Sequence, residues 1–232
     1  MVETPQRLPR SLVIDWLVIF GAAAVLTLVA MLFDLDRRIA PRILQPAAGL
    51  GEMAERASVY SFVGAACGLV LLAVPALRRR WPLAARAAGV FAATLLIAVL
   101  AIIGAMKTEI NRPRPDQTRE LGGDYGFRQP FDSEPDCDCK AFPSNAAGFG
   151  FLIATPYFVL RRRWPGLAVA LLVAGLAWGG LIGYGRMVAG RHWLTDIVWS
   201  AAVVLAVGSV LGHLTVAWRG EQRLEGAGPS AP

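Results

Sequence analysis

Long runs of apolar residues dominate the chain and alternate with shorter polar stretches. A helix needs about 20 mainly apolar residues to cross the roughly 30 Å hydrocarbon core of a bilayer. The pattern predicts membrane-spanning helices at Ser11–Phe33, Ala57–Leu77, Leu83–Met106, Ser144–Leu160, Pro165–Tyr184 and Leu194–Trp218. The fourth run is short, so we expect its helix to begin slightly earlier or to lie partly in the interface. The predicted fold is an all-α bundle of six transmembrane helices, forming one domain over residues 1–232.

The composition agrees with a membrane protein, because 55% of the 232 residues are hydrophobic and only 17% are charged. Soluble domains usually carry about 25% charged residues. The first apolar run is too long for a signal peptide, and no small-residue cleavage site closes it, so we expect an uncleaved span. The net charge of +6 is expected to serve membrane topology, and it gives no reason to infer nucleic-acid binding.

Two arginine triplets lie in very short connections between apolar runs. Arg78–Arg80 precedes Trp81-Pro82, and Arg161–Arg163 precedes Trp164-Pro165. Short cytoplasmic loops are enriched in Arg and Lys. Total basic counts on the two sides are nearly equal and leave the orientation open, but the density of these triplets favours a cytoplasmic location for them and for both termini. The long connection, residues 107–143, would then face the opposite side.

Charged residues gather on that opposite side, next to the ends of apolar runs. Lys107 and Arg114 belong to the long connection, and Arg186 belongs to the connection before the last run. The prolines on both sides of Arg114 are expected to end the third helix before it. Cations fixed in this way could clamp a phosphoryl group and neutralise its charge. The alternative is that they anchor the protein to lipid headgroups.

A histidine and an aspartate stand at the start of the last apolar run. His192 and Asp196 are spaced i, i+4 and share one face of a helix. The carboxylate could accept a hydrogen bond from one ring nitrogen and leave the other nitrogen free to attack phosphorus. The alternative is a structural pair at a helix start. The other histidine, His213, is expected to have a packing or interfacial role near the cytoplasmic side.

These residues resemble the motifs of the type 2 phosphatidic acid phosphatases, a superfamily of membrane lipid phosphatases related to vanadium haloperoxidases and soluble acid phosphatases. The first motif, Lys, six residues, Arg-Pro, is matched by Lys107–Pro115. The third motif, Ser-Arg, five residues, His, three residues, Asp, is matched by Gly185–Asp196, with glycine replacing the serine. The second motif, normally Pro-Ser-Gly-His, reads Pro-Ser-Asn-Ala at residues 143–146.

The resemblance implies a role for each matched position. His192 corresponds to the nucleophile that forms a phosphohistidine, and Asp196 corresponds to its orienting partner. The implied phosphate-binding residues are Lys107, Arg114, Ser144, Asn145 and Arg186. The resemblance implies no metal and no other cofactor.

Ala146 stands where the superfamily has the histidine that protonates the leaving oxygen. An alanine cannot donate a proton, and loss of a general acid typically costs about 10² to 10⁴ in rate. Three explanations stay open. The chain could be an engineered inactive variant, it could use another acid, or its leaving group could need little protonation, as in diphosphate cleavage.

Two cysteines, Cys137 and Cys139, precede the second motif. A disulfide across one residue is geometrically demanding, so reduced thiols or pairing between chains are favoured. The acidic run Asp132–Asp138 is expected to be a solvated loop rather than a cation site. The stretch Cys139–Ser144 is similar to sequences of some lipid A phosphatases of the superfamily, which shifts the expected substrate toward lipid A.

The sequence therefore predicts a multi-pass phosphatase of the bacterial inner membrane, with its site facing the periplasm. Its partner is a lipid phosphate in the membrane, such as lipid A, undecaprenyl diphosphate or a glycerophospholipid phosphate. One alternative is a phosphotransferase that passes the phosphoryl group to a second lipid or sugar. Another is a catalytically inactive protein that binds phosphate lipids. The sequence leaves the oligomeric state open.

Overall fold

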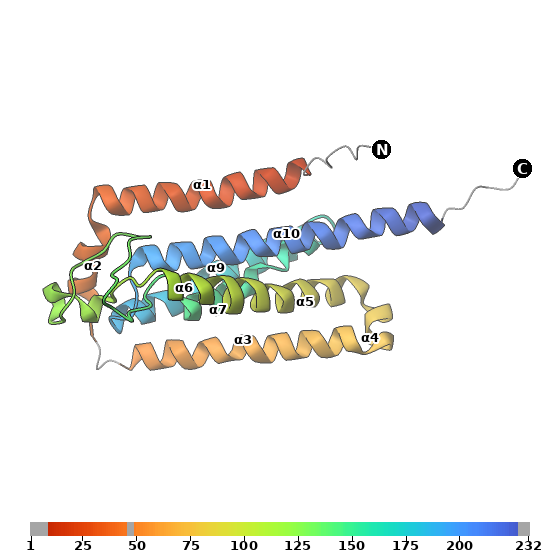
Figure 1. Ribbon diagram of the computed structural model, residues 1–232. Helices are drawn as coiled ribbons and strands as arrows, with labels where there is room; N and C mark the ends of the chain where they lie inside the picture. Colours follow the sequence, from red (N-terminus) through yellow and green to blue (C-terminus); the bar gives the residue numbers. More distant parts are fainter. Residues whose placement is uncertain (1–8, 46–48, 227–232) are drawn as a thin grey trace, which may run out of the picture.

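The computed structural model describes residues 9–45 and 49–226, which form helices and loops and, within those ranges, no β-strand. The long helices run side by side along the length of the molecule (Figure 1). They are α1 (Arg10–Leu32), α3 (Leu50–Ala73), α9 (Pro165–Val188) and α10 (Leu194–Gly226). The all-α prediction is confirmed.

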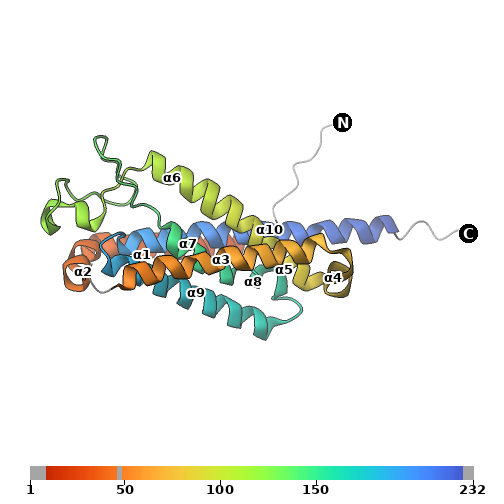
Figure 2. The ribbon, with the colours of Figure 1, turned by 90° about the horizontal axis from the view of Figure 1, so that it is seen from below.

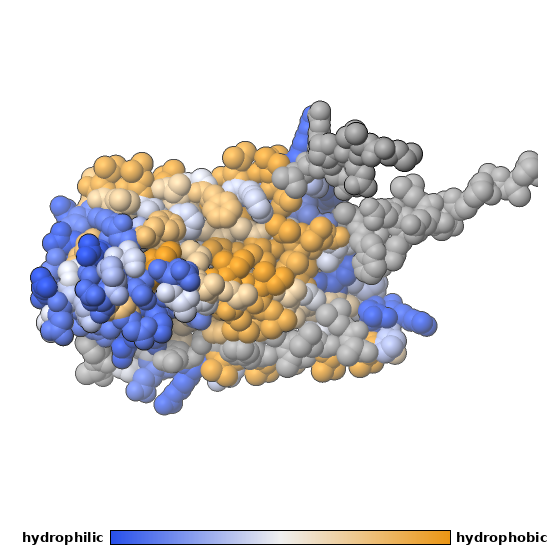
Figure 3. All heavy atoms as spheres, in the orientation of Figure 1, coloured by the Kyte–Doolittle hydropathy of each residue, from blue (hydrophilic) through white to orange (hydrophobic). Residues whose placement is uncertain are grey.

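Several of these helices have the length and apolar composition needed to cross a membrane. Among the described residues, 4 qualify by both criteria: Arg10–Leu32, Pro82–Glu109, Pro165–Val188 and Leu194–Thr215. Apolar side chains fill the middle of the molecule on the face shown in Figure 3, and hydrophilic side chains gather at one end. These features indicate a multi-pass membrane protein. Six crossings stay a prediction, which would require α3 and the shorter apolar segment Asn145–Leu160 to cross as well.

The third predicted span is continuous but changes its helical type along its length. It comprises α5 (Pro82–Thr94), the π-helical η2 (Leu95–Ile103) and α6 (Gly104–Glu109). The chain beyond it is extended at Arg114, where φ is −74° and ψ is 158°. The helix therefore ends before Arg114, as the flanking prolines predict.

The fourth predicted span is broken into α7 (Asn145–Phe151), the 3₁₀ turn η5 (Leu152–Ala154) and α8 (Tyr157–Leu160). The cause of the break is Pro156, which has no N–H to donate to the carbonyl four residues earlier. The hydroxyl of Thr155 donates to that carbonyl, on Leu152, at 2.8 Å instead. Together the pieces form the short apolar segment Asn145–Leu160, close to the predicted bounds of the fourth span, and Ser144 is the N-cap of the first piece.

Small residues let these short helices approach α9 closely. A Cβ atom on Gly175 would overlap the backbone of Ala154, and one on Gly179 would overlap the ring of Phe151. Helices α7 and α9 also pack on α10 and α3. Turned by 90°, the molecule shows α6 and α9 on opposite sides of α10 (Figure 2).

The two ends of the bundle differ in what they carry. The helix α2 (Leu35–Ile43), the loop after α6 and the connection between α9 and α10 lie at one end (Figure 1). The start of α1 and the short helix α4 (Pro75–Arg80) lie at the other. Both α5 and α9 begin with proline as their first helical residue, a position where the missing N–H of proline costs no helical hydrogen bond.

Candidate active site

His192 lies in the short connection between α9 and α10, and only 5% of it is exposed. Its Nδ1 atom is 2.7 Å from the carbonyl oxygen of Ala141. Because a carbonyl oxygen only accepts hydrogen bonds, Nδ1 must carry the ring proton. The other nitrogen, Nε2, then has a free lone pair. Burial lowers the pKa of His192 to about 4, so the ring is neutral at physiological pH.

Asp196 occupies the third position of α10, one turn after His192. Its Oδ2 atom accepts a hydrogen bond from the backbone N–H of Trp193 at 2.8 Å, which caps the helix. The same oxygen lies 3.5 Å from His192 Nδ1. The sequence predicts Asp196 as the partner of the ring, but the shorter contact is the one to the Ala141 carbonyl. The two acceptors together hold the proton on Nδ1.

Arg112 is a buried charge that the sequence analysis gave no role. Its guanidinium donates to Asp196 Oδ1 at 2.6 Å and to Asp36 Oδ2 at 2.8 Å. Thr195 completes the network, because its hydroxyl accepts from Arg112 at 2.8 Å and donates to Asp36 at 2.6 Å. This network joins α2, the loop after α6 and α10 next to the histidine. The sequence contained a sign that Asp36 would be buried, because Asp36 shares a helical face with the apolar Ala40 and Ile43.

The cations predicted to bind phosphate come from separate elements. Lys107 lies in α6 and donates to the carbonyl of Lys140 at 2.6 Å. Arg114 caps the 3₁₀ turn η3 (Pro115–Gln117), and Arg186 lies in the last turn of α9. Burial, followed by the charge of Arg191 and then of Arg186, lowers the pKa of Arg114. The positive charges of Lys107 and Arg186 both act to lower the pKa of His192. The fold therefore concentrates positive charge around this ring.

The second motif lies directly beside this group. Ser144 is fully buried, and its hydroxyl accepts from the backbone N–H of Ala147 at 3.3 Å. Its own N–H donates to the hydroxyl of Ser200 in α10 at 2.8 Å. Asn145 has a buried side-chain oxygen without a hydrogen-bond partner. Ala146 is half-buried and offers no proton donor.

A comparison with known families matches residues 87–222 to the PAP2 superfamily, which is more than half of the chain. This chain belongs to the PAP2 superfamily. A stretch of 101 residues is 33% identical to the lipid A 4'-phosphatase of Francisella tularensis subsp. novicida (strain U112). That match covers 42% of this chain and 44% of the relative, so it spans less than half of each protein. No solved structure matches the chain.

The loop before the second motif of this PAP2 chain is closed by a disulfide between Cys137 and Cys139. The expectation of reduced thiols or pairing between chains is therefore wrong. The loop bends so that the two Cα atoms lie 5.1 Å apart, within the usual range for a bridge. The third cysteine, Cys67, is free and is exposed on α3.

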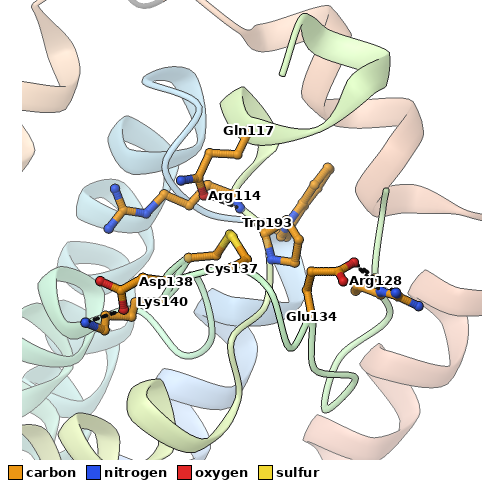
Figure 4. The surroundings of a disulfide bond; sticks show 10 residues. Arg114, Gln117, Arg128, Glu134, Cys137, Asp138, Lys140 and Trp193 are labelled. Atoms are coloured by element: carbon orange, nitrogen blue, oxygen red, sulfur yellow. Dashed lines mark hydrogen bonds and ion pairs between the residues drawn. A yellow bond between two sulfur atoms is a disulfide. The ribbon is translucent and has the colours of Figure 1, made fainter. Parts of the chain in front are cut away.

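The acidic run forms ion pairs on the two sides of this disulfide (Figure 4). Glu134 pairs with Arg128 at 2.8 Å, and Asp138 pairs with Lys140 at 2.6 Å. Within the described residues, no group of His, Cys, Asp or Glu side chains has the arrangement of a metal site.

One cavity of the described residues has no lining residue in common with the surroundings of His192. It has a volume of about 740 Å³ and lies between α1, α9 and α10. Its lining is mostly apolar, with Asp15 and Arg161 paired at 2.7 Å among the lining residues. Because His192 and the cations near it belong to the motifs found in the sequence, we place the candidate active site at His192 and not in this cavity.

Proposed function

We propose that this chain is a membrane lipid phosphatase in which His192 takes the phosphoryl group from the substrate and passes it to water. The observation that carries this proposal is the tautomer of His192. Its Nδ1–H donates to the Ala141 carbonyl at 2.7 Å, which leaves the Nε2 lone pair free to attack phosphorus. The low pKa, about 4, keeps that lone pair available.

The surrounding cations support a phosphate substrate. Phosphoryl transfer needs little covalent chemistry from the protein beyond the nucleophile, and much of the catalysis comes from positioning and charge neutralisation. Lys107, Arg114 and Arg186 would bind the non-bridging oxygens. Ser144 and Asn145 would line the same pocket. The Nε atom of Arg114 and the side-chain oxygen of Asn145 are buried without a partner, and buried polar atoms in native proteins are rarely left unpaired. A bound phosphate group would give Arg114 an acceptor.

The lipid class is proposed from the relative and from the apolar helices. The Francisella protein is a lipid A 4'-phosphatase, and the present site lies at one end of helices that can cross a membrane. A phosphate on a lipid at the membrane surface would reach such a site. We propose that this end faces the periplasm of a bacterial inner membrane, because the arginine triplets lie toward the opposite end.

The experiment is release of inorganic phosphate by the purified full chain in detergent micelles. The substrates are lipid A, undecaprenyl diphosphate and phosphatidic acid, and His192→Ala is the control. We expect release from lipid A to be fastest and to vanish in the variant. Equal rates for the wild type and the variant would contradict the proposal.

Ala146 favours one second candidate, a protein that binds phosphate lipids without turning them over. In that case, no substrate would release phosphate, although lipid phosphate would still bind. A phosphotransferase would give a third result, in which labelled phosphate moves to a second lipid or sugar faster than to water.

A further inference from the structure

Asp116 is an acidic side chain in the cation cluster that the proposed mechanism does not yet use. Its Oδ1 atom is buried and has no hydrogen-bond partner. Its Oδ2 atom lies 3.3 Å from Nη1 of Arg191, the residue before His192. The charges of Arg114 and Arg186, two of the proposed phosphate-binding residues, also act on its carboxyl group. Asp116 therefore shares its surroundings with the phosphate that we propose to bind there.

The backbone holds Asp116 against the loop that carries His192. Its N–H donates to the carbonyl of Gly190 at 3.1 Å. Gly190 has a positive φ of 72°, and a Cβ atom added there would lie 3.1 Å from the Cβ of Asp116. These contacts do not involve the carboxyl group, so an asparagine at this position would keep them.

The other acids near His192 have their oxygens engaged. Asp196 binds Arg112 and the Trp193 N–H, and Asp36 binds Arg112 and Thr195. Asp138 is exposed and paired with Lys140. Among the described residues, Asp116 has the one carboxyl oxygen that is buried without a partner. Glu134 and Asp138 of the acidic run Asp132–Asp138 form ion pairs, so this run offers weaker candidates for the proton donor.

We propose that Asp116 protonates the leaving oxygen of the substrate, in place of the histidine that Ala146 lacks. This inference rests on the proposed phosphatase function. In the first step, the Nε2 lone pair of His192 forms the N–P bond while the P–O bond to the leaving alcohol breaks. The electron pair of that bond stays on the leaving oxygen, which takes the proton of the Asp116 carboxyl group.

In the second step, the Asp116 carboxylate takes a proton from water. The water oxygen forms a new P–O bond, the N–P bond breaks, and its electron pair returns to Nε2. The products are the alcohol and inorganic phosphate, and both side chains return to their starting states.

The electrostatic setting supports a protonated carboxyl group in the complex. Burial raises the pKa of Asp116, against the opposing effects of Arg191 and Arg114. A bound phosphate would neutralise the arginines and add negative charge beside the carboxyl group. Both changes raise the pKa of a carboxyl group further. Substrate binding would therefore favour the protonated form of Asp116.

The test compares two phosphate esters with the full chain in detergent micelles. A long-chain alkyl phosphate has an alkoxide leaving group that needs a proton, whereas 4-nitrophenyl phosphate leaves as a stable anion. We expect Asp116→Asn to lower kcat for the alkyl ester about 10²-fold or more, the low end for a placed acid. The nitrophenyl ester should change less than about 5-fold. Asp138→Asn is the matched control, because it also removes a negative charge that acts on Arg114.

A rescue variant separates proton donation from positioning. Ala146→His in the Asp116→Asn background should restore most of the lost rate on the alkyl ester. Equal losses on both esters would overturn the inference and make Asp116 a positioning residue for Arg191. Unchanged rates on both would also overturn it, with the phosphatase function intact. If the wild type released phosphate from neither ester nor any lipid phosphate, the proposed function itself would fail.

Discussion

Arg112 Nη1 lies 2.6 Å from Asp196 Oδ1, and neither side chain is exposed to solvent. The same guanidinium binds Asp36 at 2.8 Å, so one buried cation joins two buried carboxylates. The Cζ atom of Arg112 also lies 5.5 Å from the ring centroid of Trp193 and 5.6 Å from that of Phe127. The position of Asp196, and through it that of His192, therefore depends on a charge network as well as on apolar packing.

Removal of Arg112 should destabilise the fold strongly. Arg112→Ala would leave two carboxylates buried without their counter-charge, which typically costs about 3–5 kcal/mol. Arg37→Ala is the matched control, because Arg37 forms an exposed pair with Glu120, and exposed pairs contribute at most about 1 kcal/mol. The measurement is reversible unfolding in detergent micelles. Similar losses for the two variants would contradict the importance that we give to burial.

Close packing between α9 and the broken fourth helix should make Gly175 intolerant of a larger side chain. Gly175→Ala would press a methyl group into the backbone of Ala154, and overpacking of this kind costs about 1–3 kcal/mol. Gly180→Ala is the control, because a Cβ there has no neighbour within 4 Å. Alanine suits a helix interior better than glycine, so the control should gain about 0.5–1 kcal/mol. Thermal unfolding of both variants would decide, and a stabilised Gly175→Ala would show that the helices are farther apart.

Because His192 is buried, its ring should take up a proton only at low pH. Its folded pKa is about 4, below the value of about 6.5 for an exposed histidine. Unfolding therefore takes up a proton between these values, and this residue lowers stability as the pH falls from about 6.5 to about 4. Nitrogen NMR of the histidine rings should show a neutral Nδ1–H tautomer for His192 at about pH 6, with His213→Gln to assign the signals. A charged ring at that pH would contradict the structure.

Membrane orientation can be tested by reporter fusions. Fusions near Arg79 and Arg162 should report the cytoplasm, and a fusion near Gly122 should report the periplasm, because arginine-rich short connections stay inside. The reverse pattern would move the site to the cytoplasmic face and the substrate to the inner leaflet.

The sequence predicted the helical fold and the groups with fixed spacing. The Lys107–Pro115 and Gly185–Asp196 patterns depend on residue type and separation, which the sequence displays directly. The positions of the long apolar helices could be predicted because their apolar composition is also visible in the sequence. The π-helical stretch Leu95–Ile103 in the third span could not be predicted, because its residues follow no comparable pattern in the sequence.

The sequence could not show contacts that the fold creates between distant segments. Asp36 and Arg112 are 76 positions apart and meet only because α2 folds against the start of α10. The acceptor for the His192 ring is the backbone carbonyl of Ala141, which no side-chain motif encodes. Asp116 follows the first motif directly in the sequence. The burial of its Oδ1 atom depends on the packing of η3 against Gly190, which the sequence does not show.

The central claim is tested most directly by locating covalent phosphate on the protein. The chain has two histidines, so a phosphohistidine, which is labile in acid and stable in base, can form only at His192 or His213. Rapid quenching of the wild type with labelled lipid phosphate, followed by peptide mapping, should place the label on His192. His192→Ala should carry no label, and His213→Gln should label like the wild type. Phosphate release without any labelled histidine, or a label on His213, would contradict the account.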